Sequence, residues 1–192
     1  MIVIVKYNAG NIKSLQNALT RLGYQSIITD NPAELMNADK VIFPGVGEAS
    51  SAMQYLKERG LDKTIISLKQ PVLGICLGLQ LMCRYSEEGD TECLGIFDTD
   101  VRLFPPVDKI PHMGWNNFLT MKGDIFKGVA LEDDVYYVHS YYAEISSCTS
   151  ATCDYILPFS ASLQRGNFYA TQFHPEKSAG IGEKILQNFL EL

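Results

Sequence analysis

Two hydrophobic patterns alternate through the first half of the chain. Short apolar runs rich in β-branched residues are typical of buried strands, and they occupy residues 2–7, 25–29, 41–43 and 72–75. Between these runs, apolar residues recur at helical spacing and predict helices over residues 12–22, 32–37, 49–59, 62–69 and 77–84. Asn11 and Asn31 stand where helix N-caps are expected. Strands that alternate with helices through short links predict an α/β fold with a mostly parallel sheet.

The second half has a different texture, with more aromatic residues, glycine and proline. Residues 135–141, 155–163 and 168–173 are expected to be strands, partly antiparallel around residues 165–167. Prolines near residues 104–111 exclude a long helix there, and residues 182–192 are expected to form a closing helix. No linker or repeat interrupts the pattern, so residues 1–192 are expected to form one domain.

Composition and charge narrow the class of protein. The chain has 192 residues, 46% hydrophobic and 20% charged, with a net charge of −6. No apolar run approaches the ~18 residues of a membrane span, and the first residues are interpreted as a strand rather than a signal peptide. The negative charge argues against a nucleic-acid surface. Five cysteines without a CxxC pair indicate free thiols in a reducing cytoplasm and no metal site.

The most informative motif places Cys76 where a predicted strand runs directly into a predicted helix. Gly74 and Gly78 flank the cysteine, and glycine removes the Cβ atoms that would clash in so tight a turn. Such a turn pushes the side chain out of the sheet edge, and the N-terminus of a helix favours a thiolate. The pattern is that of a nucleophile elbow with sulfur in place of oxygen. A buried structural cysteine is the alternative.

A cysteine nucleophile needs a base, and the chain has three histidines. His174 follows a strand, and Glu176, two residues later across a proline, is placed to orient the imidazole as the third member of a triad. His139 is the second candidate, within an expected strand. His112 lies in a proline- and glycine-rich stretch and is interpreted as structural or interfacial.

The segment Pro44-Gly45-Val46-Gly47 follows another predicted strand. It suggests a dinucleotide loop only weakly, because Ser50 stands where the third glycine of that motif belongs. A glycine loop at the carboxyl end of a strand also suits an oxyanion hole, in which a backbone N–H points at developing negative charge. In open α/β sheets the carboxyl ends of strands converge on one crevice, so this loop and Cys76 are expected to meet.

In this order, PGVG, GICLGLQ and FHPEKS resemble the class I, or triad, glutamine amidotransferases along essentially the whole chain. The segments YNAGN at 7–11, PHMGWN at 111–116 and YVHSY at 137–141 look like the glutaminase subunits of imidazole glycerol phosphate synthases. The resemblance implies a three-layer, flavodoxin-like sandwich. It also implies glutamine hydrolysis through a thioester, with no cofactor.

The resemblance also assigns roles to residues. Cys76 would attack glutamine, His174 would transfer protons and Glu176 would orient it. Backbone N–H groups of Leu77 and of the Val46-Gly47 loop would hold the oxyanion. The residues expected to bind glutamine are Gln80, Glu88, His139, Ser140 and Tyr141. Glu88 suits this role because a carboxylate pairs with an α-ammonium group.

A partner follows from the same resemblance. Ammonia would pass to a (β/α)₈-barrel cyclase that makes imidazole glycerol phosphate and an aminoimidazole carboxamide ribotide. A barrel takes about 250 residues, so it must be a second chain in a heterodimer. Asn11, Trp115 and Lys177 are expected at that interface. The alternatives are a paralogous subunit for an amidino-sugar pathway, a stand-alone cysteine hydrolase, and a binding module that kept the fold without catalysis.

Overall fold

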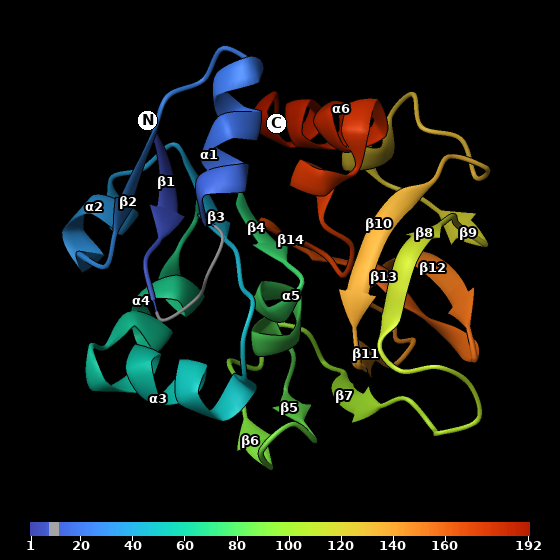
Figure 1. Cartoon of the computed structure of the whole chain (residues 1–192). Helices are drawn as coiled ribbons and strands as arrows, with labels where there is room; N and C mark the ends of the chain where they lie inside the picture. Colours follow the sequence, from blue (N-terminus) through green and yellow to red (C-terminus); the bar gives the residue numbers. More distant parts are fainter. Residues whose placement is uncertain (8–11) are drawn as a thin grey trace.

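A twisted central sheet organises the molecule, as Figure 1 shows for the computed structural model, which describes residues 1–7 and 12–192. Its strands lie in the order β2 (Ser26–Thr29), β1 (Ile2–Val5), β3 (Lys40–Phe43), β4 (Val72–Ile75), β14 (Phe168–Thr171), β13 (Leu157–Arg165), β12 (Thr149–Tyr155) and β9 (Thr120–Met121). The strands from β2 to β14 are parallel, and the remaining three pair antiparallel. The predicted α/β class with a mostly parallel sheet is confirmed.

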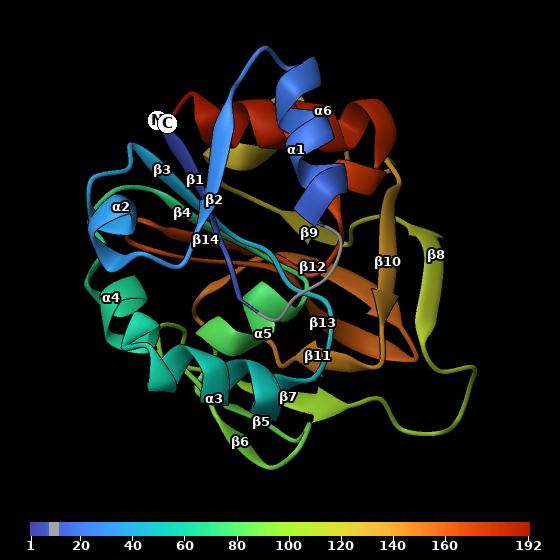
Figure 2. The ribbon, with the colours of Figure 1, turned by 60° about the vertical axis from the view of Figure 1, so that its left-hand side comes forward.

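Helices cover both faces of this sheet and give the predicted three layers (Figure 2). One face packs against α2 (Pro32–Met36), α3 (Ala49–Glu58), α4 (Leu61–Ser67) and α5 (Leu77–Met82). The other packs against α1 (Ile12–Arg21), α6 (Ala179–Leu190) and the 3₁₀ turn η1 (Asp124–Phe126). Each face therefore has its own apolar core, and the sheet is buried between them. None of the helices in the described part of the chain is long and apolar enough to cross a membrane.

Two smaller sheets complete the fold. The hairpin-like pair β8 (His112–Asn116) and β10 (Val135–His139) is antiparallel. A second sheet has the order β11 (Tyr141–Ala143), β7 (Asp100–Leu103), β5 (Tyr85–Ser86) and β6 (Thr91–Glu92). The chain between β14 and α6 holds the 3₁₀ turn η2 (Pro175–Lys177). These additions surround the carboxyl end of β4, where Cys76 lies.

The first half follows the sequence pattern closely. Asn31 caps α2 through its side chain, which accepts a hydrogen bond from Ala33 N at 3.0 Å, and Pro32 is the first helical residue. The other expected helices and strands differ from the observed ones by a few residues at their ends. The predicted cap at Asn11 lies outside the described residues.

The second half departs further from prediction, and none of the strands β5 to β9 was expected from the sequence. The single strand expected over 135–141 is wrong, because the chain breaks at Ser140 and continues as β11 in another sheet. The break is fixed by Ser140 O, which accepts from Phe104 N at 3.1 Å.

The strand expected over 155–163 corresponds to β13, which begins at Leu157. Tyr155 instead ends the preceding strand β12, and Ile156 forms the corner between them in a left-handed conformation at φ 64°. Residues 149–154 alternate small and polar side chains that carry little hydrophobic signal. β12 was therefore not predicted from the sequence.

Candidate active site

Cys76 sits at a strained turn between β4 and α5. Its backbone has φ 54° and ψ −107°, a region that costs a non-glycine residue about 1–3 kcal/mol. The turn is also bonded to the neighbouring strand β14, since Cys76 N donates to Thr171 O at 2.8 Å. A Cβ on Gly78 would lie 1.9 Å from Phe43 O, which explains the glycine after the cysteine. A Cβ on Gly74 would meet Met82 Sδ at 2.5 Å.

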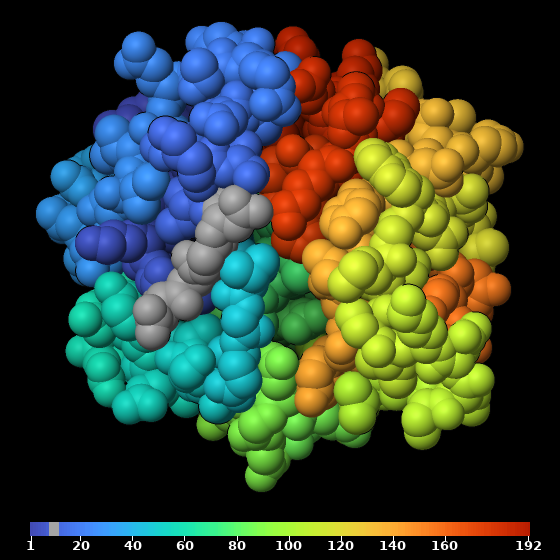
Figure 3. Space-filling view, viewed as in Figure 1, coloured from blue at the N-terminus to red at the C-terminus, as the bar shows by residue number. Residues whose placement is uncertain are grey.

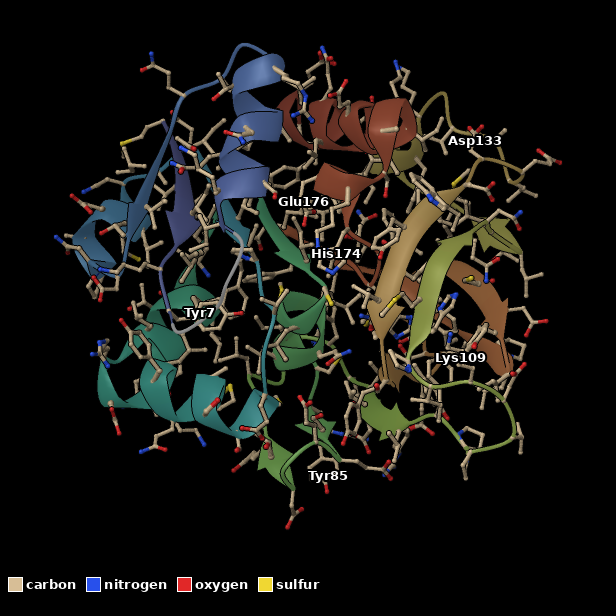
Figure 4. The ribbon with its side chains drawn as sticks, in the orientation of Figure 1. Tyr7, Tyr85, Lys109, Asp133, His174 and Glu176 are labelled. Carbon is tan, nitrogen blue, oxygen red and sulfur yellow. The ribbon has the colours of Figure 1, made fainter. Side chains whose placement is uncertain are left out.

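His174 and Glu176 reach the same place from the turn η2 (Figure 4). Glu176 Oε1 lies 2.8 Å from His174 Nδ1, and both side chains are almost fully buried. Burial alone would lower the pKa of His174, but the Cys76 sulfur and the Glu176 carboxylate together raise that pKa to about 10. The buried Nε2 makes no other hydrogen bond within the described residues. The charged form of the His174 imidazole is therefore favoured beside the Cys76 sulfur.

Ser178 fixes the turn that carries this pair. Its hydroxyl donates to His174 O at 2.6 Å and accepts from Tyr136 N at 2.9 Å. His174 N donates in turn to Tyr136 O at 2.9 Å. The base is thus bonded through its own backbone to strand β10, which also forms a wall of the site.

A cavity of about 320 Å³ opens beside Cys76 and is the hollow visible between the cyan, green and orange segments in Figure 3. Every residue proposed from the sequence for the oxyanion loop or for glutamine binding lines it. Its walls consist of Val46, Gly47, Cys76, Leu77, Gln80, Glu88, Pro111, Val138, His139, Ser140 and Tyr141. A more open recess of about 480 Å³ near Arg84 and Cys148 has no histidine in its lining. The smaller cavity is therefore the one that the candidate nucleophile Cys76 lines.

Polar groups at opposite sides of this cavity are held in place. Gln80 Nε2 donates to Tyr141 O and to Gln172 Oε1, both at 3.0 Å. Glu88 Oε2 accepts from Ala49 N at 2.8 Å, at the start of α3. Burial raises the pKa of Glu88, while this backbone hydrogen bond opposes the shift. A carboxylate and an amide therefore line one cavity in fixed orientations.

The loop at residues 44–47, expected to hold an oxyanion, is supported by Tyr7. Its hydroxyl donates to Pro44 O at 2.5 Å, and a Cβ on Gly45 would fall 2.1 Å from that hydroxyl. Gly47 has φ 126°, a conformation that favours glycine. Leu77 N, one of the expected oxyanion donors, donates to Gly45 O at 3.3 Å. In this conformation that N–H group is already engaged.

The hydrogen bonds of His139, the second candidate base from the sequence, disfavour that role. Its Nδ1 lies 2.7 Å from Tyr141 O, which can only accept, so Nδ1 carries the proton. Its Nε2 then accepts from His112 Nδ1 at 3.0 Å. Burial, the larger cause, lowers the pKa of His139 to about 3 and that of His112 to about 4. These two rings form a neutral buried pair.

Of the three residues expected at the partner interface, the structure describes Trp115 and Lys177. Trp115 on β8 is 55% exposed and packs edge-on against Tyr136, with the ring centroids 5.8 Å apart. Met113 on the same face of β8 is exposed as well. Lys177 lies in η2, next to the triad, and is half-buried. Asn11 lies outside the described residues.

Three supporting residues were not assigned a role from the sequence. Tyr7 was noted only as part of a motif, and Ser178 only as the end of another. Gln172 is fully buried two residues before His174. An amide in an otherwise apolar strand was the one signal that could have singled it out.

Comparison with known proteins identifies the family of the chain. The family model for class-I glutamine amidotransferases matches residues 3–192. The chain is 59% identical to imidazole glycerol phosphate synthase subunit HisH of Bacteroides fragilis strain YCH46, over 100% of the chain and 99% of the relative. It is 56% identical to the HisH subunit of Bacteroides thetaiotaomicron, over 100% and 99%.

A solved glutamine amidotransferase structure shares the fold, with a TM-score of 0.76 at 16% identity, covering 100% of this chain and 98% of that one. The family match and the end-to-end similarity to HisH subunits show that the chain belongs to the class-I glutamine amidotransferase family.

Proposed function

We propose that Cys76 attacks the side-chain amide carbon of glutamine bound in the 320 Å³ cavity. The sulfur–carbon bond forms as the carbonyl π pair moves onto oxygen, and backbone N–H groups around Val46, Gly47 and Leu77 hold that charge. His174, which takes up the thiol proton, donates it to the amide nitrogen. Ammonia leaves, and the glutaminyl thioester remains on Cys76.

The second half of the cycle uses the same groups in reverse. His174 takes a proton from water, which attacks the thioester carbon. The tetrahedral intermediate collapses, the carbon–sulfur bond breaks and its electron pair returns to sulfur as glutamate is released. Glu176, bonded at 2.8 Å to Nδ1, holds the imidazole in one tautomer through both halves.

Substrate recognition falls to the polar groups of the cavity wall. Glu88 suits the α-ammonium group of glutamine, and Gln80 with the 139–141 backbone suits the remaining polar atoms. The observation that carries the proposal is the buried His174–Glu176 pair beside Cys76, whose sulfur raises the pKa of His174 and which itself lines the cavity.

The products of this chain imply a second chain. Ammonia protonates in water, so it must pass directly to the enzyme that uses it. The HisH relatives are named as subunits of imidazole glycerol phosphate synthase. We infer that a (β/α)₈-barrel cyclase subunit docks over the exposed face of β8, with Trp115 as an anchor and Lys177 near the rim.

The test is the Cys76→Ala variant in complex with a candidate cyclase. Glutamine-dependent synthesis should fall below detection, because no thioester can form. Ammonia-dependent synthesis should persist, because the cyclase chemistry lies on the other chain. The matched control is Cys153→Ala, a buried thiol away from the cavity lining, which should retain glutamine-dependent activity. Loss of both activities in Cys76→Ala would contradict the proposal.

A further inference from the structure

Gln172 lies directly behind the nucleophile. Its side chain is fully buried, and its Nε2 is 3.7 Å from Cys76 Sγ, within range of a hydrogen bond to sulfur. The backbone of this region is tied to the elbow, since Cys76 N donates to Thr171 O at 2.8 Å. The amide is therefore presented to the sulfur by the strand that neighbours β4.

The direction of this hydrogen bond follows from a series of contacts that runs from Tyr141 O through the Gln80 amide to the Gln172 amide. Tyr141 O is a backbone carbonyl and can only accept, so the Gln80 atom that faces it at 3.0 Å must be nitrogen. That nitrogen also faces one amide atom of Gln172 at 3.0 Å, which must then be oxygen. The remaining amide atom of Gln172, the one facing Cys76, is nitrogen. Reversing either amide would set two donors or two acceptors against each other.

A primary amide N–H group donates and never accepts. Held against sulfur, it stabilises the thiolate more than the thiol, because hydrogen bonds to charged groups are the stronger ones. Two further titratable groups act on Cys76. His174 lies beside it, and Tyr7 is so buried that its pKa is raised well above the ordinary value. Tyr7 already donates to Pro44 O, and in the thiol form Cys76 Sγ itself donates to Val138 O at 3.9 Å. Within the described residues, Gln172 Nε2 is therefore the group that donates a hydrogen bond to the sulfur.

We propose that Gln172 is a further catalytic residue, whose amide N–H stabilises the Cys76 thiolate before attack and again as the thioester is hydrolysed. It transfers no proton at either point. Its oxygen has a second task, since it accepts from Gln80 and so fixes the amide that lines the glutamine cavity. The inference rests on the proposed role of Cys76 as nucleophile.

Two variants separate these two tasks. Gln172→Met is close to the native shape but has neither donor nor acceptor. Gln172→Glu keeps an acceptor for Gln80 and loses the donor to sulfur. Asn167→Leu is the matched control, because Asn167 is also an amide beside β14 and donates to Leu68 O and Gln70 O at the opposite end of the strand.

The measurement is the rate of alkylation of Cys76 by iodoacetamide in the full chain across pH 5–10, with the labelled peptide identified by mass spectrometry. In Gln172→Met the midpoint of this profile should move upward by about one pH unit, the shift expected from losing one hydrogen bond to a charge. In Gln172→Glu the midpoint should move upward further, because the carboxylate also places a negative charge beside the sulfur. Asn167→Leu should keep the wild-type midpoint. Glutaminase kcat should fall about tenfold in both Gln172 variants, and KM should rise only in Gln172→Met.

The outcomes distinguish this inference from the function on which it rests. If Cys76 is the labelled thiol but the Gln172 variants keep the wild-type midpoint, Gln172 only fills space and the inference is overturned. If wild-type Cys76 is not labelled preferentially over Cys83, Cys148 and Cys153, the proposed function itself fails. If Gln172→Met does not fold, Gln172→Leu, which also lacks a donor and carries no charge, decides in its place.

Discussion

At the scale of single residues, the proposed triad divides into two groups that change bonds and one that orients. In the proposed cycle His174 moves protons in both halves, whereas Glu176 acts through a hydrogen bond to its Nδ1. Glu176 Oε2 is buried without a partner in the described part of the chain, so the carboxylate is committed to one bond through Oε1. Their replacement should therefore have unequal effects.

We expect Glu176→Gln to lower kcat about 10–100-fold, and His174→Ala to lower it by more than 1,000-fold, since only the second removes the proton-transferring group. Glutamine still binds in both variants, so KM should change little. Steady-state glutaminase kinetics of both variants in parallel provide the measurement. A Glu176→Gln loss as large as that of His174→Ala would show that the carboxylate does more than orient.

The buried pair His112 and His139 makes a second prediction at this scale, about stability. The ring of His112 is stacked between Tyr137 and Tyr155, with centroid distances of 4.7 and 4.1 Å. Both folded-state pKa values, about 4 and about 3, lie below the ordinary value of 6.5. A histidine depressed in this way contributes stability that is present above pH 6.5 and is lost as the pH falls toward the folded-state values.

The free energy of unfolding should therefore decrease between pH 6.5 and pH 4, by about 1.4 kcal/mol per unit of pKa difference as an upper bound. Urea unfolding at a series of pH values measures it. His112→Phe should be less stable at pH 7, because His139 Nε2 loses its donor, yet its stability should fall less steeply with acid. Equal slopes in the two proteins would contradict a neutral pair.

At the scale of elements, helix α6 holds the triad turn from outside. A Cβ on Gly182 would lie 1.9 Å from Pro175 O, whereas one on Gly180, two residues earlier in the same helix, would meet nothing within 4 Å. Neither glycine has a positive φ, so the two positions differ in the space around them.

Gly182→Ala should push α6 away from the turn that bears His174 and Glu176. We expect it to lower the free energy of unfolding by about 1–3 kcal/mol. Since a displacement near 1 Å misaligns reacting groups, kcat should also fall, about 100-fold. Gly180→Ala, the matched control, should gain roughly 0.5–1 kcal/mol through helix propensity and keep its activity. Urea unfolding and glutaminase assays on both variants test this, and similar behaviour of the two would show that α6 does not position the site.

The sequence predicted those structural features whose cause lies in residues adjacent along the chain. The strands and helices up to α5 carry their own periodicity and caps, and the tight turn at Cys76 shows in its two glycines. The break at Ser140 and the corner at Ile156 arise from hydrogen bonds and pairing between distant segments, which no local pattern contains. The same holds for Gln172, whose role depends on two residues 92 and 96 positions away.

At the scale of the whole molecule, strand β10 and the cavity wall connect the exposed face of β8 to the proposed oxyanion loop. Strand β8 pairs with β10, and β10 leads through His139 into the cavity wall at residues 139–141. Leu77 N, an expected oxyanion donor, is bonded to Gly45 O in the described conformation. An oxyanion hole that lacks one donor forfeits roughly 3 kcal/mol of transition-state stabilisation, about a hundredfold in rate.

We therefore expect the isolated chain to be a poor glutaminase and the docked complex to be faster. A partner can shift the loop only through contacts that differ between its two orientations, and Gly47, at φ 126°, leaves the loop backbone free to change. The measurement is steady-state glutaminase turnover of the chain alone, with an unliganded cyclase and with a liganded one. Turnover should rise at each step, by about a hundredfold in all. Trp115→Ala should weaken the dependence on cyclase concentration without changing the basal rate, because its side chain lies outside the cavity lining. Equal turnover in the three conditions would show that the loop is already competent in the isolated chain, and would leave the triad assignment intact.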